Sequence, residues 1–150
     1  MKKLYLLLIP AFLIFLTGCG GSGKKMICTI STTSNGIELK ADYTIKHDGK
    51  YAQSAEFHEE YTPQDSSLLG QLETLIKQTY ESANNNFGGY KINVKTSGSK
   101  VVADVTVDYE KMDLQKAIQS SEDVKSFVED GKMSVDKMKS TYESIGYTCK

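Results

Sequence analysis

The chain contains no arginine and no tryptophan among its 150 residues, and it has few prolines, histidines and cysteines. Without the planar guanidinium of arginine, a phosphate or carboxylate site would lack a group that binds with two parallel hydrogen bonds. The sequence also has no nucleophile elbow, HExxH, phosphate-binding loop or GxGxxG motif. We therefore expect no catalytic residues, no metal and no cofactor, and we predict that the protein is not an enzyme.

The sequence has one long apolar run, from Leu4 to Leu16, directly after Lys2 and Lys3. A helix that spans a membrane needs about 20 residues, so this run is too short to cross one. A basic start followed by a short apolar stretch is typical of a signal peptide. The run therefore predicts export from the cytoplasm.

Leu16-Thr17-Gly18-Cys19 ends this run and resembles the lipobox of bacterial lipoproteins. The resemblance implies that residues 1–18 are removed and that the Cys19 thiol carries a diacylglyceryl group. Two acyl chains hold a protein on a membrane stably, at about 0.8 kcal/mol per buried methylene. The alternative is an ordinary secretory signal that contains a cysteine. We predict an extracytoplasmic protein that is lipid-anchored to the cell membrane.

Glycines, a serine and two lysines follow the anchor, so residues 19–25 read as the lipidated cysteine and a flexible tether. Residues 26–150 are then one domain, long enough for a core. Cleavage before Cys19 leaves 16 lysines against 19 acidic residues. This acidic balance in an exported protein argues against nucleic acid. We expect the membrane as one partner, and an envelope protein, peptide or glycan as another.

Cys28 and Cys149 are the cysteines that the anchor does not use. In an exported protein two such residues usually pair, so we expect a disulfide that closes nearly the whole domain. Free thiols and a metal pair are the alternatives. The metal pair is disfavoured because no histidine or second cysteine pair accompanies the two thiols.

Alternating apolar and polar residues predict half-buried strands at 26–31, 37–45 and 51–61. Asn35-Gly36 is a strong signal for a two-residue hairpin turn, and it places Cys28 opposite Tyr43. The next connection is less direct. A two-residue turn at 48–49 would place Leu39 opposite a histidine and mismatch the faces. We therefore predict a three-residue loop at 47–49, which pairs Leu39 with Phe57.

A helix is expected next, with Thr62 as its N-cap and Pro63 in its first turn, ending near 84–86. A hairpin turn at Ser97-Gly98 then pairs Val94 with Val101. Helical segments follow at 113–118, 122–129 and 134–145, and Gly146 ends the last one before the chain returns to the sheet. The order predicts an α+β fold: an antiparallel sheet of about five strands (βββ-α-ββ-α) with helices packed on one face.

Several short motifs together resemble the YehR-like lipoproteins, a bacterial family described by a domain of unknown function, DUF1307. These motifs are the lipobox, the short tether, Cys28-Thr29 at the start of the first strand, Asp48-Gly49 in a hairpin, and the ending 146–150, Gly-Tyr-Thr-Cys-Lys. The resemblance covers residues 24–150. It implies an α+β domain, and it brings no established activity and no catalytic residues.

The chemistry-bearing residues are few. His47 and His58 are the only histidines, and His58 lies among Glu56, Glu59 and Glu60. Carboxylates that converge there would hold a divalent cation. The alternation instead puts Glu56 and Glu60 with His58 on the exposed face and points Glu59 the other way, so a solvated charged surface is favoured over a metal site.

Asp108 and Asp113 lie near a predicted strand end, where a carboxylate site would fit, although turn and N-cap roles are favoured for them. Tyrosines are numerous and sit at core-compatible positions, where they line either a core edge or a ligand groove. Those at such positions are Tyr43, Tyr51, Tyr61, Tyr80, Tyr90, Tyr109, Tyr142 and Tyr147.

The leading functional prediction is a non-catalytic binding or accessory module anchored on the membrane surface. Two alternatives stand beside it: an envelope enzyme with a site near Asp108 and Asp113, and an assembly factor that binds another envelope protein. A binding module should show a tyrosine-lined concavity, an enzyme should show close buried carboxylates, and an assembly factor should show an exposed apolar patch.

Replacing the lipidation cysteine tests the anchor. Cys19→Ala should leave an uncleaved precursor that incorporates no labelled palmitate, because the acyl acceptor is gone. Mass spectrometry of the membrane fraction and palmitate labelling measure the two effects. Processing between Gly18 and the new alanine would contradict the lipobox assignment.

Overall fold

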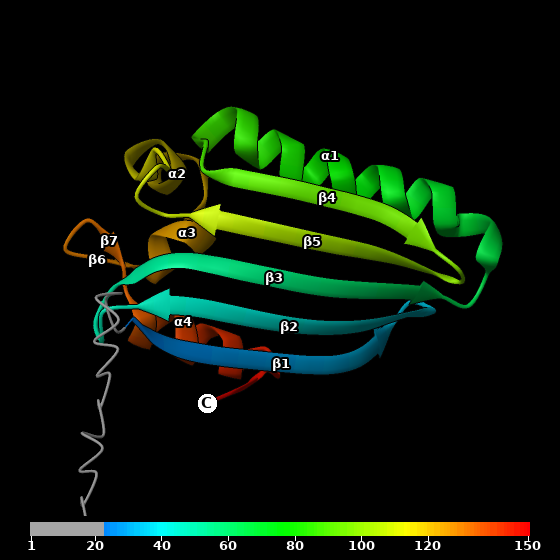
Figure 1. The fold of residues 1–150 in the computed structure, drawn as a ribbon, viewed down its shortest axis with the longest axis horizontal. Coiled ribbons are helices and arrows are strands. Elements are labelled where there is room, and N and C mark those ends of the chain that lie inside the picture. The colour runs from blue at the N-terminus through cyan, green and yellow to red at the C-terminus, as the bar shows by residue number, and fades with distance from the viewer. Residues whose placement is uncertain (1–22) are drawn as a thin grey trace, which may run out of the picture.

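One antiparallel sheet forms the centre of the molecule (Figure 1). The computed structural model describes residues 23–150. Its strands are β1 (Lys24–Ser34), β2 (Ile37–His47), β3 (Ala52–Pro63), β4 (Tyr90–Ser97), β5 (Lys100–Asp108) and β8 (Thr148–Cys149). They lie in the order β4-β5-β3-β2-β1-β8, and every neighbouring pair is antiparallel.

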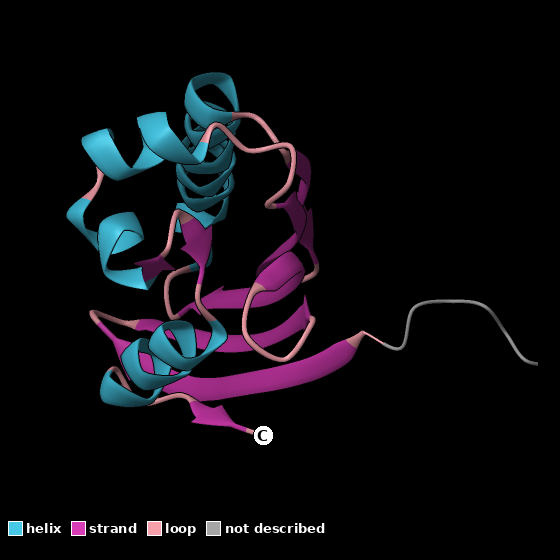
Figure 2. Cartoon of the chain, turned by 90° about the vertical axis from the view of Figure 1, so that its left-hand side faces the viewer, coloured by secondary structure: helices cyan, strands magenta, loops and turns pink. Residues whose placement is uncertain are grey.

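The helices lie on one side of this sheet, as Figure 2 shows from the end. They are the 3-10 helix η1 (Ser66–Leu68), α1 (Leu69–Phe87), α2 (Leu114–Ser120), α3 (Glu122–Phe127) and α4 (Val135–Ser144). Two short strands, β6 (Val128–Glu129) and β7 (Lys132–Met133), form a separate hairpin. The predicted α+β fold with helices on one face is confirmed.

The buried apolar core is divided into two clusters. The larger one lies under α4 and contains Cys28, Ile45 and Met138, each fully buried. The smaller one lies under α1 and contains Ile76 and Val101. Because α1 packs mainly on β4 and β5 while α4 packs at the β1 and β8 edge, the helix-covered face of β2 and β3 lies between them.

The first hairpin has the predicted register, with Cys28 opposite Tyr43. Asn35 and Gly36 both have positive φ, 50° and 76°. Positive φ at both central residues belongs to the turn whose twist matches that of the strands, and asparagine followed by glycine adopts it most readily. This prediction is confirmed.

The predicted register of the second hairpin is wrong. Leu39 pairs with Tyr61 rather than with Phe57. The turn is longer than three residues because Asp48 Oδ1 accepts hydrogen bonds from the backbone N–H groups of Lys50 and Tyr51, both at 2.7 Å. The ladder also slips by one residue at Lys46/His47. The resulting shift of four residues is even, so the predicted buried and exposed faces survive.

The predicted register of the third hairpin is also wrong, by two residues. Val94 pairs with Ala103 rather than with Val101, because the turn consists of Gly98 and Ser99. Gly98 takes a φ of 62° at the first turn position, where a serine would carry a steric cost. The even shift again keeps the apolar side chains on one face.

The long helix begins later than predicted. Thr62 and Pro63 are the last residues of β3, and Gln64 N–H donates to Gly36 O at 2.8 Å, which continues the sheet one residue further. Asp65 caps the 3-10 helix η1 that precedes α1, because its carboxylate accepts from Ser67 N–H at 2.9 Å. The helix α1 continues past the predicted end to Phe87.

The C-terminal helices lie close to the predicted positions. Asp113 caps α2 by accepting from Lys116 N–H at 3.0 Å. The predicted segment 122–129 is helical only to Phe127, since its last two residues form β6. Ser134 is the N-cap residue of α4. Its hydroxyl donates to Glu129 at 3.1 Å and makes no capping hydrogen bond to the helix.

A disulfide joins the two ends of the domain. Cys28 on β1 and Cys149 on β8 are opposite each other, with 4.1 Å between their Cα atoms and a sequence separation of 121 residues. Lys24 and Lys25, which the sequence placed in the tether, are the first two residues of β1. Cys19 and the predicted signal peptide lie outside the described residues.

Removing the disulfide should destabilise the domain. In the chain-entropy model, a crosslink that closes a loop of about 100 residues contributes up to about 4.7 kcal/mol. Cys28→Ser/Cys149→Ser should therefore unfold at a clearly lower urea concentration than the native chain. Intact mass without reductant should be about two units below the reduced mass. Equal masses and an unchanged urea midpoint would show that the two thiols are unpaired.

Candidate ligand-binding groove

A buried glutamate accepts three tyrosine hydroxyls between the two halves of the core. Glu59 on β3 is 3% exposed. Its Oε1 accepts from Tyr43 on β2 at 2.6 Å, and its Oε2 accepts from Tyr61 on β3 at 2.7 Å and from Tyr80 on α1 at 2.8 Å. We call these four residues the tyrosine–glutamate cluster.

The cluster satisfies a buried carboxylate with neutral donors instead of a cation. Buried acidic groups are normally paired with a positive charge. Within residues 23–150, every lysine and histidine ion pair involves a carboxylate other than Glu59. Burial, and then the nearby Glu59 charge, raise the pKa of the Tyr43, Tyr61 and Tyr80 hydroxyls well above the usual value. The three phenols therefore stay protonated and donate to Glu59.

Small residues on both neighbouring strands make room for this cluster. Ala41 on β2 and Ala103 on β5 are directly opposite Glu59, and both are almost fully buried. A larger side chain at either position would occupy the space over Glu59 that the tyrosine rings use. The alternation of β3 points Glu59 toward the helices together with Tyr61, two residues on.

An aromatic layer closes the cluster on the side of α4. The Tyr43 ring lies 4.5 Å from the ring centre of Phe57, 5.5 Å from that of Tyr142 and 5.0 Å from that of Tyr147. Edge-to-face and tilted pairs at such distances are favourable. The orientation of Tyr43, and hence one of the three donors to Glu59, is therefore fixed by the C-terminal part of the chain.

A groove of about 430 Å³ opens on the other side of the cluster, between α1 and the turn that joins β1 and β2. Tyr61 and Tyr80 belong both to the cluster and to the groove wall. The apolar walls come from α1 and β2, with Leu72, Leu75, Ile76, Ile37 and Leu39.

The groove is apolar and accessible. Leu75 on α1 is 61% exposed although it lines the groove, and Leu68, beside the same groove, is 40% exposed. Hydroxyl groups of Thr32, Ser34 and Thr79 supply its few polar atoms. A concave apolar surface with a small number of polar groups is the usual form of a ligand site. The arrangement can hold an apolar group, and it brings no nucleophile or base together.

The histidines occupy separate positions and hold no metal site. His58 Nδ1 lies 2.6 Å from Asp104 Oδ1 on the exposed face of the sheet, and this hydrogen bond raises the pKa of His58 above its usual value. Glu56 pairs with a lysine there. His47 is buried near the β2–β3 turn and accepts from Gly49 N–H. No group of three or more potential ligands in residues 23–150 is arranged to hold a metal ion.

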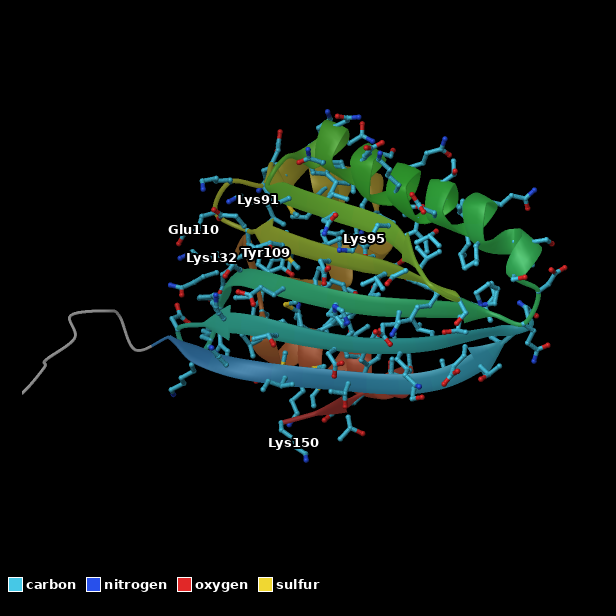
Figure 3. All side chains as sticks on the ribbon, turned by 45° about the vertical axis from the view of Figure 1, so that its right-hand side comes forward. Lys91, Lys95, Tyr109, Glu110, Lys132 and Lys150 are labelled. Atoms are coloured by element: carbon cyan, nitrogen blue, oxygen red, sulfur yellow. A yellow bond between two sulfur atoms is a disulfide. The ribbon has the colours of Figure 1, made fainter. Side chains whose placement is uncertain are left out.

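The two aspartates near the strand end have structural partners. Asp108 pairs with Lys111 at 2.7 Å, which lowers the pKa of its carboxyl group, and Asp113 caps α2. The neighbouring Tyr109 and Glu110 lie at the end of the sheet opposite the β1–β2 turn (Figure 3). The structure therefore does not bring Asp108 and Asp113 together as a pair of buried carboxylates.

Sequence reasoning missed the role of Glu59. The alternation separated it correctly from Glu56, His58 and Glu60, but nothing marked the inward glutamate as the acceptor for tyrosines. The one sequence feature that could have indicated this role is that Glu59 occupies an inward-facing strand position, like its aromatic neighbours. Among the predicted core tyrosines, Tyr51 differs: its hydroxyl donates to Asp130 in an exposed pair at 2.8 Å.

Comparison with known proteins agrees with this fold. A family model described as "Domain of unknown function (DUF8824)" matches residues 21–150. The chain belongs to the DUF8824 family. Another similar protein is the uncharacterized lipoprotein Lin0239 of Listeria innocua, which is 30% identical over 124 residues; the match covers 83% of this chain and 74% of that protein.

Two solved structures share the fold of this DUF8824 chain. The YehR protein of Escherichia coli has a TM-score of 0.58 at 17% identity, over 85% of this chain and 92% of that one. A protein from Streptococcus pneumoniae TIGR4 has a TM-score of 0.53 at 16% identity, over 100% and 98% of the two chains. The resemblance to YehR-like lipoproteins is confirmed, although the matching family number is DUF8824 rather than DUF1307. No helix within residues 23–150 of this DUF8824 protein is long and apolar enough to span a membrane.

Removing one donor from the cluster should destabilise the fold in a pH-dependent way. Tyr80→Phe leaves Glu59 with two donors, and a hydrogen bond to a charged group contributes about 1.5–3 kcal/mol, so the free energy of unfolding at pH 8 should fall by that amount. Because the pKa of Tyr80 is raised on folding, its contribution is complete below about pH 10 and is lost above it at about 1.4 kcal/mol per pH unit. The free energy of unfolding of Tyr80→Phe should therefore fall less steeply with pH above pH 10 than that of the native chain.

Urea denaturation at pH 8 and between pH 10 and 11 measures both effects. Tyr51→Phe is the matched control at pH 8, because it removes a hydroxyl that donates to the exposed Asp130 instead of Glu59. A cost for Tyr80→Phe no larger than that for Tyr51→Phe would show that the cluster is not a significant source of stability.

Proposed function

We propose that this protein is a non-catalytic binding module, held on the outer face of the cell membrane by lipid on Cys19, and that the groove beside the tyrosine–glutamate cluster takes its ligand. The single observation that supports this proposal most is the open apolar groove of about 430 Å³ with Tyr61 and Tyr80 in its wall. The lipoprotein relative from Listeria innocua supports the anchor.

The groove is held in one shape by the sheet and by a hydrogen bond, which favours a role in ligand binding. Its floor is built on three paired strands, and Tyr80 is tied to Glu59 across the interface between α1 and the sheet. A site that is fixed before the ligand arrives binds with a smaller entropy cost. Leu75 lies on the wall of this site and is more than half exposed. A ligand in the groove would cover its side chain.

The position of the groove also suits an anchored receptor. β1 has 11 residues, and at about 3.3 Å per residue the strand spans roughly 35 Å from its anchored start to the groove. The groove lies at the β1–β2 turn, whereas the chain enters the domain at Lys24, at the other end of the sheet (Figure 1). Cys19 precedes Lys24 by five residues, which reach at most about 18 Å. The groove is therefore presented away from the anchor to ligands in the surrounding envelope.

The non-catalytic part of the proposal has separate support. Asp108 and Asp113, the candidates for an enzymatic carboxylate site, are engaged with Lys111 and with the first turn of α2. Glu59, the one buried carboxylate among the described residues, has three hydrogen-bond donors already. The groove has hydroxyls and apolar side chains, which position a ligand without supplying a general base.

A charged side chain in the groove wall should weaken binding of an apolar probe. The domain without its lipid should bind the neutral dye Nile red, and Leu75→Glu should weaken this binding about tenfold, because a carboxylate would have to be desolvated. Fluorescence titration measures the affinity.

Ile145→Glu is the matched control. Ile145 is 62% exposed, as against 61% for Leu75, but it lies outside the groove at the end of α4. Equal dye binding by the two variants, or no binding by the native domain, would count against the groove as the ligand site.

A further inference from the structure

We propose that the ligand of the groove is an extended peptide segment that pairs with the free half of the β1 edge and places an apolar side chain in the groove. The inference rests on the proposed function and names the class of ligand. Two independent observations support it: the hydrogen-bonding groups along β1, and the charge and hydrogen-bonding state of the groove floor.

The outer edge of β1 is only half covered. Ile27 exchanges two main-chain hydrogen bonds with Lys150, each at 2.9 Å. In an antiparallel strand the N–H and C=O of one residue point to the same side, and alternate residues share that side. Ser31 and Thr33 therefore direct their main-chain groups away from β2, as Ile27 does. β8 pairs with Cys28 and Thr29 and reaches no further along this edge.

Within residues 23–150, no strand pairs with the outer side of Ser31 or Thr33. Lys150 marks the covered half of the edge in Figure 3. An added peptide strand would find two donors and two acceptors in the second half. Main-chain pairing with an exposed sheet edge is an established way of binding extended peptides, with side-chain pockets for selectivity.

The free half of the edge adjoins the groove. Thr32 and Ser34 alternate with Ser31 and Thr33 along β1, so their side chains lie on the helix-covered face, where both line the groove. Every second side chain of an added strand would point to that same face. Such a side chain would meet the apolar wall formed by Leu39 on β2 and Leu75 on α1.

The opposite edge strand of the sheet, β4, has features that protect an edge against pairing with another chain. β4 carries Lys91 and Lys95, which are labelled in Figure 3, and lysines on an edge strand discourage pairing with another chain. The stretch of β1 from Ile30 to Ser34 carries no charged residue. The β4 edge is also partly occupied, because the main-chain N–H groups of Tyr90 and Thr96 donate to Asn84 and Glu73 of α1. The second half of the β1 edge has neither these contacts nor the lysines, and it has the groove beside it.

The floor of the groove selects against acidic ligands. The hydroxyl protons of Tyr61 and Tyr80 are donated to Glu59, so these two wall residues have no hydroxyl proton left to donate to a ligand. No lysine or histidine within the described part of the chain forms an ion pair with the buried Glu59 charge. A fatty acid or an acidic side chain would be repelled, whereas a neutral or lysine-bearing apolar peptide would be accepted.

Selection from a phage-displayed library of random seven-residue peptides tests the proposal. We expect enriched sequences that alternate, with apolar residues at every second position and few acidic residues. Binding of a synthesised winner should fall about tenfold in Ser31→Pro, which removes one outward N–H, because a main-chain hydrogen bond contributes about 1 kcal/mol and proline also distorts the partner ladder.

Ser31→Ala is the matched control, because it removes the side chain and keeps the main-chain N–H, and it should bind like the native domain. Melting temperatures and Nile red binding establish that both variants retain the fold and the groove. N-methylation of alternate peptide nitrogens should weaken the winner as Ser31→Pro does.

Three outcomes would overturn the inference: no enrichment of any peptide, equal peptide binding by Ser31→Pro and Ser31→Ala, or displacement of Nile red by octanoate but not by a peptide. Each of these leaves the proposed function standing if Nile red still distinguishes Leu75→Glu from Ile145→Glu. Failure of the dye experiment itself would count against the groove as a ligand site. The two experiments therefore distinguish failure of the peptide inference from failure of the proposed function.

Discussion

The burial of Glu59 is the constraint on which the arrangement of the domain depends. A carboxylate removed from water costs several kcal/mol unless hydrogen bonds compensate for the lost hydration. The three donors come from β2, β3 and α1, so these elements must meet at one point in a fixed orientation. Tyr80 is the only donor from a helix, and its reach to Glu59 sets the distance of α1 from the sheet. The groove lies beside this contact, while apolar packing on β4 and β5 holds the helix over that part of the sheet.

The disulfide lies next to the cluster on the same face of the sheet, since Cys28 is directly opposite Tyr43. Cys149 places β8 against the first half of β1, and the preceding Tyr147 packs on Tyr43, a donor to Glu59. The chain terminus thus orients the cluster and at the same time covers part of an exposed edge. Since β8 is only two residues long, the cover ends where the groove begins. The first half of β1 is therefore crosslinked and paired with β8, and the second half lines the groove.

The fold could be predicted from sequence because its main signal has a period of two. Alternation assigned the faces of the strands, and even errors of register, by four residues at Leu39 and by two at Val94, left those faces unchanged. The cluster could not be predicted in the same way. A three-residue loop would have placed Gln53 opposite Tyr43, far along the strand from Glu59. The observed turn, set by the hydrogen bonds of Asp48, places Phe57 there and brings Tyr43 beside Glu59.

The anchor and the groove are linked through β1. The strand begins at Lys24, beside the tether, is crosslinked to the C-terminus at Cys28, and ends beside the groove at Ser34. If the groove and the lipid anchor act as proposed, a load applied to a ligand would be transmitted along this strand, and the crosslink near its start ties β1 to the C-terminal part of the domain. The sequence of β1 follows this division: its first half supplies core residues and the cystine, while its second half is uncharged and hydroxyl-rich, with main-chain groups directed outward. Stability alone does not require the second half of β1 to lack a strand partner on its outer side, as it does within residues 23–150.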